Sequence, residues 1–368
     1  MARRLRKPSV CRSRSRRTGE VTRLQRLRHL ALISAILLPW AAMTAAASSP
    51  IVIAHRGASG YLPEHTLAAK AMAHAMGADF IEQDVVLTRD GVPIVLHDIH
   101  LESTTDVALR FPDRARADGR YYAIDFTLAE IRSLRAQERL NSDGQAVYPG
   151  RFPAHTGDFR VPTLAEEIDL ISGLDRSRQR RTGLYIEFKS PRFHRREGHD
   201  IAQRVLDVLR EKGYDQRSEQ VFLQCFDDET LRYLRHELKS PLPLIQLIAD
   251  PGWGEDSAVD YAFLQTAGGL DAVAGYADGI GPWLEQIYLG QDAQGKPVLS
   301  NLVALAHARG LQVHPYTFRA DALPAGIDSF DALLQLFFFE LGVDGVFTDF
   351  PDLARTLLQD HRQHRTPQ

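Results

Sequence analysis

Residues 51–66 read IVIAHRGASGYLPEHT and residues 80–98 read FIEQDVVLTRDGVPIVLHD, and these two segments are the most informative part of the chain. Each begins with an apolar run typical of a buried strand. The first run ends in His55 and Arg56. The second contains Glu82 and Asp84, whose side chains share one face because strand residues two apart point the same way. Two predicted strands therefore carry charged side chains at or near their ends.

A tight hairpin is expected after the second strand. Asp90-Gly91 favours a two-residue turn, and such a turn makes Arg89 face Val92 across the hairpin. The same register lays His97 beside Asp84. Two histidines, an arginine and two carboxylates would then lie at one end of a small sheet. That combination suits a divalent cation and acid–base chemistry on a phosphate.

Strand-like and helix-like segments alternate along most of the chain. The expected strands are residues 51–54, 80–87, 92–96, 183–188, 220–225, 242–248, 279–281, 311–316 and 345–347. The expected helices include residues 67–76, 201–212, 229–239, 302–309 and 330–341. This alternation predicts parallel βα units, and one of the nine strands is the antiparallel return of the hairpin. The predicted fold class is therefore α/β, a TIM-type (β/α)8 barrel spanning residues 48–358.

Residues 99–162 interrupt the alternation. They are rich in Pro, Gly, Tyr and Arg, show little periodicity, and are too long for a plain loop in a compact domain. We interpret them as a small subdomain inserted after the second-strand hairpin, called the insert below. Residues 359–368 are polar, and we expect them to form a frayed C-terminal tail.

The first 47 residues differ in charge from the rest of the chain. They hold 11 of the 44 Lys and Arg residues and one of the 47 Asp and Glu residues, so residues 48–368 carry a net charge of −13. A body this acidic argues against non-specific binding of nucleic acid. A basic stretch, a short apolar run and then Ala45–Ala47 are typical of a cleaved signal peptide, which predicts an exported protein without a stable membrane anchor. The alternative is a retained anchor, but Pro39 makes the apolar run short for a membrane span.

Three carboxylates have the spacing of a metal site. Glu82, Asp84 and Glu187 lie inside otherwise apolar strands. Each alone could pair with a basic residue at the barrel rim, but together they would repel one another unless a cation neutralised them. Oxygen ligands suit Ca²⁺, with Mg²⁺ also acceptable, rather than zinc.

The other polar residues at strand ends suit phosphate chemistry. His55 and His97 are candidates for the acid–base pair, because imidazole titrates near neutral pH. Arg56 and Lys189 are candidates for holding phosphate oxygens. In a barrel, the C-terminal strand ends converge on the catalytic mouth. By that rule, two further residues are expected to contact substrate, namely Gln224 and Tyr316.

The sequence gives weaker indications of the roles of three more residues. Glu64 could orient a catalytic histidine or simply lie near a helix start. Cys225 remains alone if Cys11 is removed with the signal peptide, so no internal disulfide can form, and we expect it to be a buried packing residue. Asp349 follows the last predicted strand, where it could hold the ring of strands closed.

Six motifs together resemble the glycerophosphodiester phosphodiesterase family, and most closely its periplasmic bacterial branch. They are HRGASGYLPEHT, EQDVVLTRDGVPIVLHD, IEFK, LQCFD, VHPYTFR and GVFTDFPD. The resemblance runs from about residue 51 to residue 358 and implies a TIM-type barrel with an insertion. It also implies hydrolysis of glycerophosphodiesters, such as glycerophosphocholine or glycerophosphoethanolamine, to sn-glycerol 3-phosphate and an alcohol. A periplasmic location is implied as well.

The resemblance assigns roles residue by residue. It makes His55 and His97 the catalytic pair, and it implies that Arg56 and Lys189 hold the phosphate. The metal ligands it implies are Glu82, Asp84 and Glu187, with Ca²⁺ the usual ion. His65 stands where the widespread motif has Asn, which puts the role of His65 in doubt.

Two other functions remain open from the sequence. A phospholipase C- or D-like enzyme would act on lipid and should expose an apolar rim, which is not evident near the motifs. A non-catalytic surface binding protein would have no need of an acid–base pair. The sequence also leaves open a homodimer.

Overall fold

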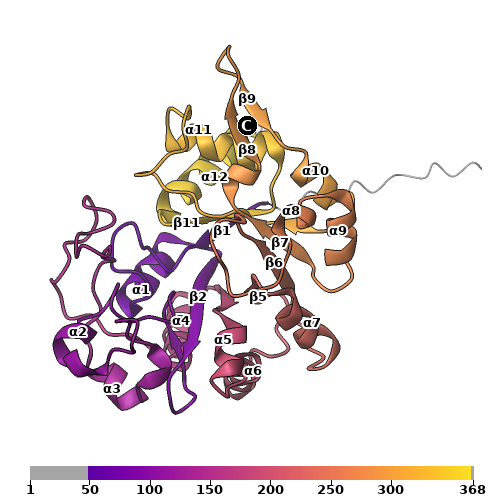
Figure 1. The fold of residues 1–368 in the computed structure, drawn as a ribbon. Coiled ribbons are helices and arrows are strands. Elements are labelled where there is room, and N and C mark those ends of the chain that lie inside the picture. The colour runs from indigo at the N-terminus through magenta and orange to yellow at the C-terminus, as the bar shows by residue number, and fades with distance from the viewer. Residues whose placement is uncertain (1–48, 366–368) are drawn as a thin grey trace, which may run out of the picture. The chain divides into compact units, whose positions relative to one another are not determined.

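The computed structural model describes residues 49–365 (Figure 1). The chain divides into two units after Ala47, and the described residues all belong to the second. The expected signal peptide, residues 1–47, lies outside the described residues. Among residues 49–365, no helix combines the length and apolar character needed to cross a membrane.

Within residues 49–365, eight parallel strands form a nearly closed barrel, which confirms the predicted fold class. They are β1 (Ile51–Ala54), β2 (Phe80–Leu87), β4 (Gly183–Phe188), β5 (Val221–Cys225), β6 (Leu244–Ile248), β7 (Gly279–Pro282), β10 (Gln312–Val313) and β11 (Gly345–Thr348). Strand β1 pairs with both β2 and β11. The remaining seam lies between β10 and β11, where the Phe318 N–H donates to the Phe347 carbonyl at 2.8 Å. The C-terminal strand ends therefore surround one mouth.

Helices surround the barrel in the described chain (Figure 1). The longer ones are α1 (Leu67–Met76), α4 (Leu164–Arg178), α6 (Ile201–Glu211), α7 (Asp228–His236), α9 (Ala267–Val273) and α12 (Pro351–Arg365). The shorter ones are α5 (Pro191–Arg196), α8 (Tyr261–Leu264), α10 (Leu302–His307), α11 (Phe330–Gln335), the π-helical turn η4 (Leu336–Leu341) and the 3-10 turn η3 (Leu284–Gln286). Local chemistry sets their ends: the Thr66 side chain caps α1, and Gly77 ends it at φ 89°.

Helix α12 corrects the expected tail. It runs to Arg365, so residues 359–365 are helical rather than frayed. Packing explains the difference, because the His361 ring stacks on Phe339 with centroids 3.7 Å apart. A polar sequence can stay helical when one face has such a partner.

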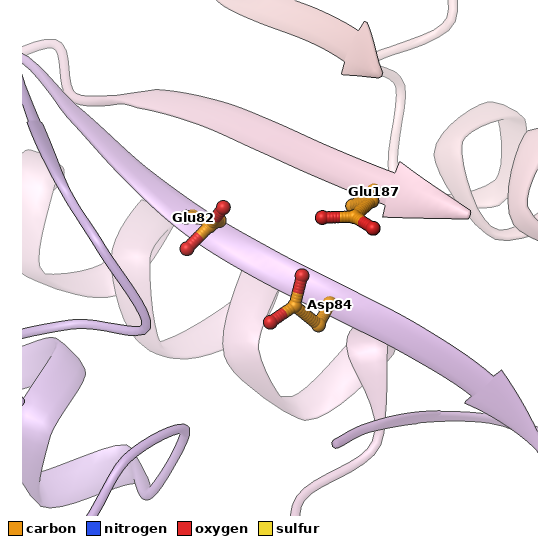
Figure 2. A group of neighbouring side chains, drawn as sticks. All are labelled: Glu82, Asp84 and Glu187. Carbon is orange, nitrogen blue, oxygen red and sulfur yellow. The ribbon is translucent and has the colours of Figure 1, made fainter. Parts of the chain in front are cut away.

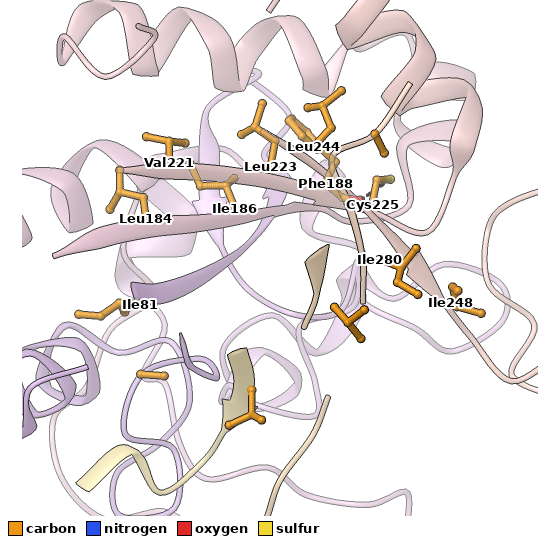
Figure 3. Packing of buried hydrophobic residues seen from close by; sticks show 14 of the residues in the cluster. Ile81, Leu184, Ile186, Phe188, Val221, Leu223, Cys225, Leu244, Ile248 and Ile280 are labelled. Carbon is orange, nitrogen blue, oxygen red and sulfur yellow. Dashed lines mark hydrogen bonds between the residues drawn. The ribbon is translucent and has the colours of Figure 1, made fainter. Parts of the chain in front are cut away.

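Side chains along each strand alternate between the outer and the inner face of the barrel, and they form two separate hydrophobic clusters. Outward side chains, including Ile81, Ile186 and Leu223, pack beneath the helices (Figure 3). Cys225 lies in this outer cluster with no exposed surface, which confirms that it is a buried packing residue. Inward side chains form a second cluster inside the barrel: Ile53, Phe80, Tyr185, Phe222, Ile245 and Phe347. This inner cluster is the floor on which the polar residues of the mouth lie.

The insert has a hydrophobic cluster of its own. Its elements are α2 (Val107–Arg110), η1 (Pro112–Arg114), η2 (Ala123–Asp125) and α3 (Leu128–Ser133). Leu101, Phe126 and Ile131 pack there with side chains from the hairpin, such as Val86 and Ile94. The insert is therefore anchored to the outer face of the hairpin beside the barrel mouth.

The hairpin register differs from the prediction by one residue. Strand β3 (Pro93–Val95) pairs with β2 so that Val85 faces Val95, and the Leu96 N–H donates to the Asp84 carbonyl at 2.9 Å. The turn has three residues rather than two, because the Thr88 N–H donates to the Val92 carbonyl at 3.1 Å and leaves residues 89–91 in the turn, with Gly91 at φ 74°. The prediction that His97 lies directly opposite Asp84 was therefore wrong.

A second hairpin was not predicted. Strands β8 (Tyr288–Gln291) and β9 (Pro297–Leu299) form a two-stranded sheet apart from the barrel. Most of its residues are exposed, so its sequence lacks the apolar alternation that identifies a buried strand.

Candidate active site

Three carboxylates lie together at the barrel mouth. Glu82 and Asp84 come from β2, and Glu187 comes from the neighbouring strand β4, where it pairs in register with Asp84. Each offers an oxygen, and these oxygens lie within 4.8 Å of one another. Figure 2 shows the three carboxylates pointing toward one shared space. All three residues are buried.

The electrostatics of this trio favour a cation. Burial, and then the charge of Asp84, raises the pKa of Glu82 to about 8. Burial also raises the pKa of Glu187 well above its usual value, although Lys189 opposes this. Within the described residues, Asp84 Oδ1 and Gln224 Oε1 are buried and have no hydrogen-bond partner. Free buried oxygens of this kind fit a hard divalent cation.

His65 has a structural partner beside the trio. Its Nε2 lies 2.7 Å from Asp84 Oδ2, and its Nδ1 lies 3.1 Å from Lys70 Nζ. Lys70 in turn pairs with Glu167 at 3.0 Å, with both side chains fully buried. Although burial disfavours the charge of Asp84, His65 holds the pKa of Asp84 well below its usual value. His65 therefore orients one of the three carboxylates.

His55 is held in one orientation by Asp349. Its Nδ1 lies 2.5 Å from Asp349 Oδ1, and its Nε2 lies 3.8 Å from Glu82 Oε2. Asp349 also accepts from Arg151 at 2.7 Å and from Arg319 at 2.9 Å. Burial, and then Arg56, lowers the pKa of His55 to about 4. With Nδ1–H donated to Asp349, a neutral His55 turns its Nε2 lone pair toward the carboxylates, where it can accept a proton.

His97 has a matching arrangement. Its Nδ1 lies 2.6 Å from Asp98 Oδ1, and its Nε2 lies 3.4 Å from Lys189 Nζ. Burial, followed by Arg56 and Lys189, lowers the pKa of His97 to about 4. The structure therefore brings both histidines to the mouth even though the hairpin register differs from the prediction.

Arg56 and Lys189 lie among the carboxylates. Arg56 Nε is 3.5 Å from Asp84 Oδ2, and its Nη1 is 3.1 Å from Glu64. Lys189 Nζ is 2.6 Å from Glu187 Oε1. Arg56 adopts φ 58°, a strained conformation for a side chain of this size and one that is often found at functional sites.

The remaining predicted site residues also reach this space. A cavity of about 270 Å³ is lined by the trio, both histidines, Arg56 and Lys189, together with Gln224 and Tyr316. Gln224 Nε2 donates to Glu82 Oε1 at 3.0 Å. The hydroxyl of Tyr316 donates to the Ile248 carbonyl at 2.8 Å, so Tyr316 offers the cavity mainly its ring.

Several residues of the site were missed or left open in the sequence analysis. Glu64 pairs with Arg56 and with Arg139, the latter at 2.7 Å, so it orients no histidine. Arg139 also binds Asp98 at 2.6 Å. Asp98 directly follows His97 in the sequence, which is a signal that could have been used, and Asp349 was noted after β11 but not as the partner of His55. Arg139 and Arg151 lie in the insert, where no periodic pattern identifies them.

Comparison with known proteins agrees with this geometry. Residues 55–353 match the Glycerophosphoryl diester phosphodiesterase family. The chain is 43% identical to a Haemophilus influenzae glycerophosphodiester phosphodiesterase, covering 85% of this chain and 90% of that protein. It is 38% identical to the Treponema pallidum glycerophosphodiester phosphodiesterase, covering 84% and 91%.

Solved structures share the fold. A Silicibacter pomeroyi protein assigned as a glycerophosphoryl diester phosphodiesterase superposes with a TM-score of 0.64 at 26% identity, covering 85% of this chain and 94% of that one. An Oleispira antarctica phosphodiesterase in complex with sn-glycerol-3-phosphate superposes with a TM-score of 0.55 at 22% identity, covering 84% and 97%. By the extent of these matches, the chain belongs to the glycerophosphoryl diester phosphodiesterase family.

Proposed function

We propose that this protein hydrolyses glycerophosphodiesters, such as glycerophosphocholine and glycerophosphoethanolamine, to sn-glycerol 3-phosphate and an alcohol. The observation that carries the proposal is the pairing of two His–Asp units, His55–Asp349 and His97–Asp98, around one carboxylate-lined cavity. A binding protein would have no use for two oriented proton-transfer groups. The family relationship supports the substrate class.

The metal proposal rests on the oxygen-rich trio. Glu82, Asp84 and Glu187 would hold a divalent cation, and Ca²⁺ suits an all-oxygen donor set. When bound, such an ion neutralises charge on the phosphate oxygens. Without it, burial and mutual repulsion disfavour the ionised forms of Glu82 and Glu187.

Arg56 and Lys189 would bind the phosphate from the protein side. Lys189 is buried and Arg56 is partly buried at the cavity, and both are already oriented by carboxylates. Donors held in place before the reaction stabilise developing negative charge without a reorganisation cost. Binding would also bring negative charge close to His97, which counteracts the effect of Arg56 and Lys189 on the pKa of that histidine.

The two histidines would divide the proton transfers. His55, neutral and held by Asp349, would take a proton at Nε2 from the nucleophile, which is either water or the glycerol 2-hydroxyl. His97 would deliver a proton from Nε2 to the departing alcohol oxygen. Asp98 would stabilise the protonated form of His97 that this role requires.

The test is a coupled assay for released glycerol 3-phosphate, run with and without a chelator. We expect turnover of water-soluble head-group diesters, loss of turnover on chelation, and recovery with Ca²⁺ more than with Mg²⁺. Intact phospholipids form the second arm of the panel. Turnover of phospholipid without turnover of the soluble diesters would replace the proposal with a lipid-directed phospholipase.

Export to the periplasm is a further part of the proposal. It is supported by the basic and apolar pattern of residues 1–47. N-terminal sequencing of protein from the periplasmic fraction should begin at Ser48. The mass of the mature protein in solution, measured by light scattering, separates a monomer from the homodimer that the sequence leaves open.

A further inference from the structure

A second chamber adjoins the catalytic cavity. It has a volume of about 210 Å³ and shares His55, Arg56, His97 and Arg319 with the first cavity. The carboxylate trio does not line it. Its outer wall comes from the insert: Glu138, Arg139, Val147, Tyr148 and Arg151. The two spaces therefore meet at the two histidines and Arg56.

The arginines of this chamber already have carboxylate partners. Arg56 and Arg139 both bind Glu64, at 3.1 Å and 2.7 Å. Arg151 binds Asp321 at 2.8 Å and Asp349 at 2.7 Å. Arg319 binds Asp349 at 2.9 Å. These four guanidinium groups are thus largely neutralised within the protein.

Of the three carboxylates that line the chamber, only Glu138 has a buried oxygen without a hydrogen-bond partner. It is only 3% exposed, and its Oε2 has no hydrogen-bond partner anywhere in residues 49–365. Burial, and then the charge of Glu64, raises the pKa of Glu138 to about 7. Keeping a carboxylate oxygen buried without a partner is unfavourable, and a cationic ligand at that wall would remove the penalty.

The chamber lies where one of the two ester substituents of a bound phosphodiester would be placed. A phosphate served by both histidines must lie where the two spaces meet, and the attacking and leaving oxygens lie roughly in line on opposite sides of the phosphorus. When the glycerol 2-hydroxyl is the nucleophile, the glycerol substituent and the departing head group then lie on opposite sides of the phosphorus, one in each space. The glycerol substituent is uncharged, whereas choline and ethanolamine each carry one positive charge.

We infer that the insert chamber is the head-group subsite and that Glu138 is the counter-ion for a cationic head group. This inference rests on the proposed function and extends it to substrate preference. The volume of about 210 Å³ suits a small head group, since pockets for drug-sized ligands measure about 300–1,000 Å³. The insert, rather than the barrel, then selects among glycerophosphodiesters.

The experiment compares kcat/KM of the wild type and Glu138→Gln on glycerophosphocholine, glycerophosphoethanolamine and uncharged glycerophosphoglycerol. Glutamine keeps the size and removes the charge. We expect about tenfold or greater loss on both cationic substrates and less than about twofold change on the uncharged one. The uncharged substrate also reports whether the variant is folded. An equal change on all three substrates overturns the inference.

Glu255→Gln is the matched control. Glu255 is a half-buried carboxylate that lines the other cavity, beside Trp253 and Trp283. We expect this variant to keep the wild-type ratio between cationic and uncharged substrates. If Glu255→Gln removes the preference and Glu138→Gln does not, the head group lies in the catalytic cavity and the inference is wrong.

Inhibition of the wild-type protein by choline tests the subsite without any variant. Choline chloride should compete with glycerophosphoglycerol in the wild type, and sodium chloride at equal ionic strength should not. Absence of this competition counts against the subsite. Failure of the wild type to cleave any of the three diesters would instead refute the proposed function.

Discussion

Asp349 Oδ1 lies 2.5 Å from Nδ1 of His55, although 294 positions separate the two residues in the sequence. His55 follows β1 and Asp349 follows β11, and these strands are neighbours because the barrel closes on itself. The closure therefore brings together the His55–Asp349 pair, proposed above as the general base, as well as forming a stable sheet. Asp349 was expected to hold the ring of strands closed; its carboxylate does bridge His55 and Arg319, and thereby orients the imidazole.

Asp349→Asn should lower kcat strongly while preserving the fold. An amide at this position can donate to Nδ1, which would favour the tautomer with a proton on Nε2 and remove the base. We expect a loss of about 10²–10⁴-fold in kcat, the usual contribution of a positioned base. Steady-state kinetics and circular dichroism check this together. An unchanged kcat would remove His55 from the base role.

His97→Ala should affect substrates according to their leaving groups. Natural substrates release an alkoxide that needs a proton, whereas a diester with an acidic phenol releases a stable phenolate without help. We expect turnover of glycerophosphocholine to be abolished and turnover of the phenolic diester to be largely spared. Equal loss on both substrates contradicts the leaving-group role of His97.

Divalent cation should stabilise the protein through the trio. Binding to the folded state alone raises the free energy of unfolding by about 2.7 kcal/mol when the ligand is at 100 times its Kd. Calcium should therefore raise Tm, and Glu187→Gln should reduce the rise by removing a ligand. Thermal melts over a calcium series test this. The same increase in Tm in the variant would place the ion elsewhere.

Acid should destabilise the protein in a way that depends on Arg139. Although burial opposes it, Arg139 holds the pKa of Glu64 below its usual value, and His97 followed by Arg139 holds the pKa of Asp98 below its usual value. The unfolded chain then binds more protons near pH 4, so this stabilisation is present above about pH 4 and is lost as pH falls further. Arg139→Met should be less stable at neutral pH and should show a shallower decline in acid. Urea denaturation at several pH values measures both effects, and parallel pH curves for the two proteins would contradict the assignment.

Gly91→Ala should test the left-handed backbone conformation of Gly91 in the hairpin turn. Gly91 adopts φ 74°, and a Cβ there would come no closer than 3.5 Å to its neighbours, Arg204 and His199. The expected loss is therefore backbone strain alone, about 1–2 kcal/mol in the free energy of unfolding. Gly91→Asn should lose less, because Asn tolerates this conformation better. Equal stability of all three proteins would contradict the positive φ at Gly91.

Local sequence was sufficient for the strands, the barrel and the groups at the strand ends. Period-two alternation predicted which face of β2 carries Glu82 and Asp84, and parallel strands necessarily bring their carboxyl ends to one mouth. The carboxylate trio and both histidines of the mouth could therefore be identified before any contact was known. The hairpin register could not, because Asp90-Gly91 fits two-residue and three-residue turns alike.

The sequence by itself determined the fold class and the chemical types gathered at the mouth, since both follow from short-range periodicity. Tertiary structure alone decided which carboxylate orients which histidine, and it assigned Glu64 to Arg56 and Arg139 instead. It also decided that the aperiodic insert places Glu138 in a chamber beside the histidines. These pairings join residues distant in the chain, and their partners are selected by how the barrel closes and where the insert packs, which no local pattern encodes.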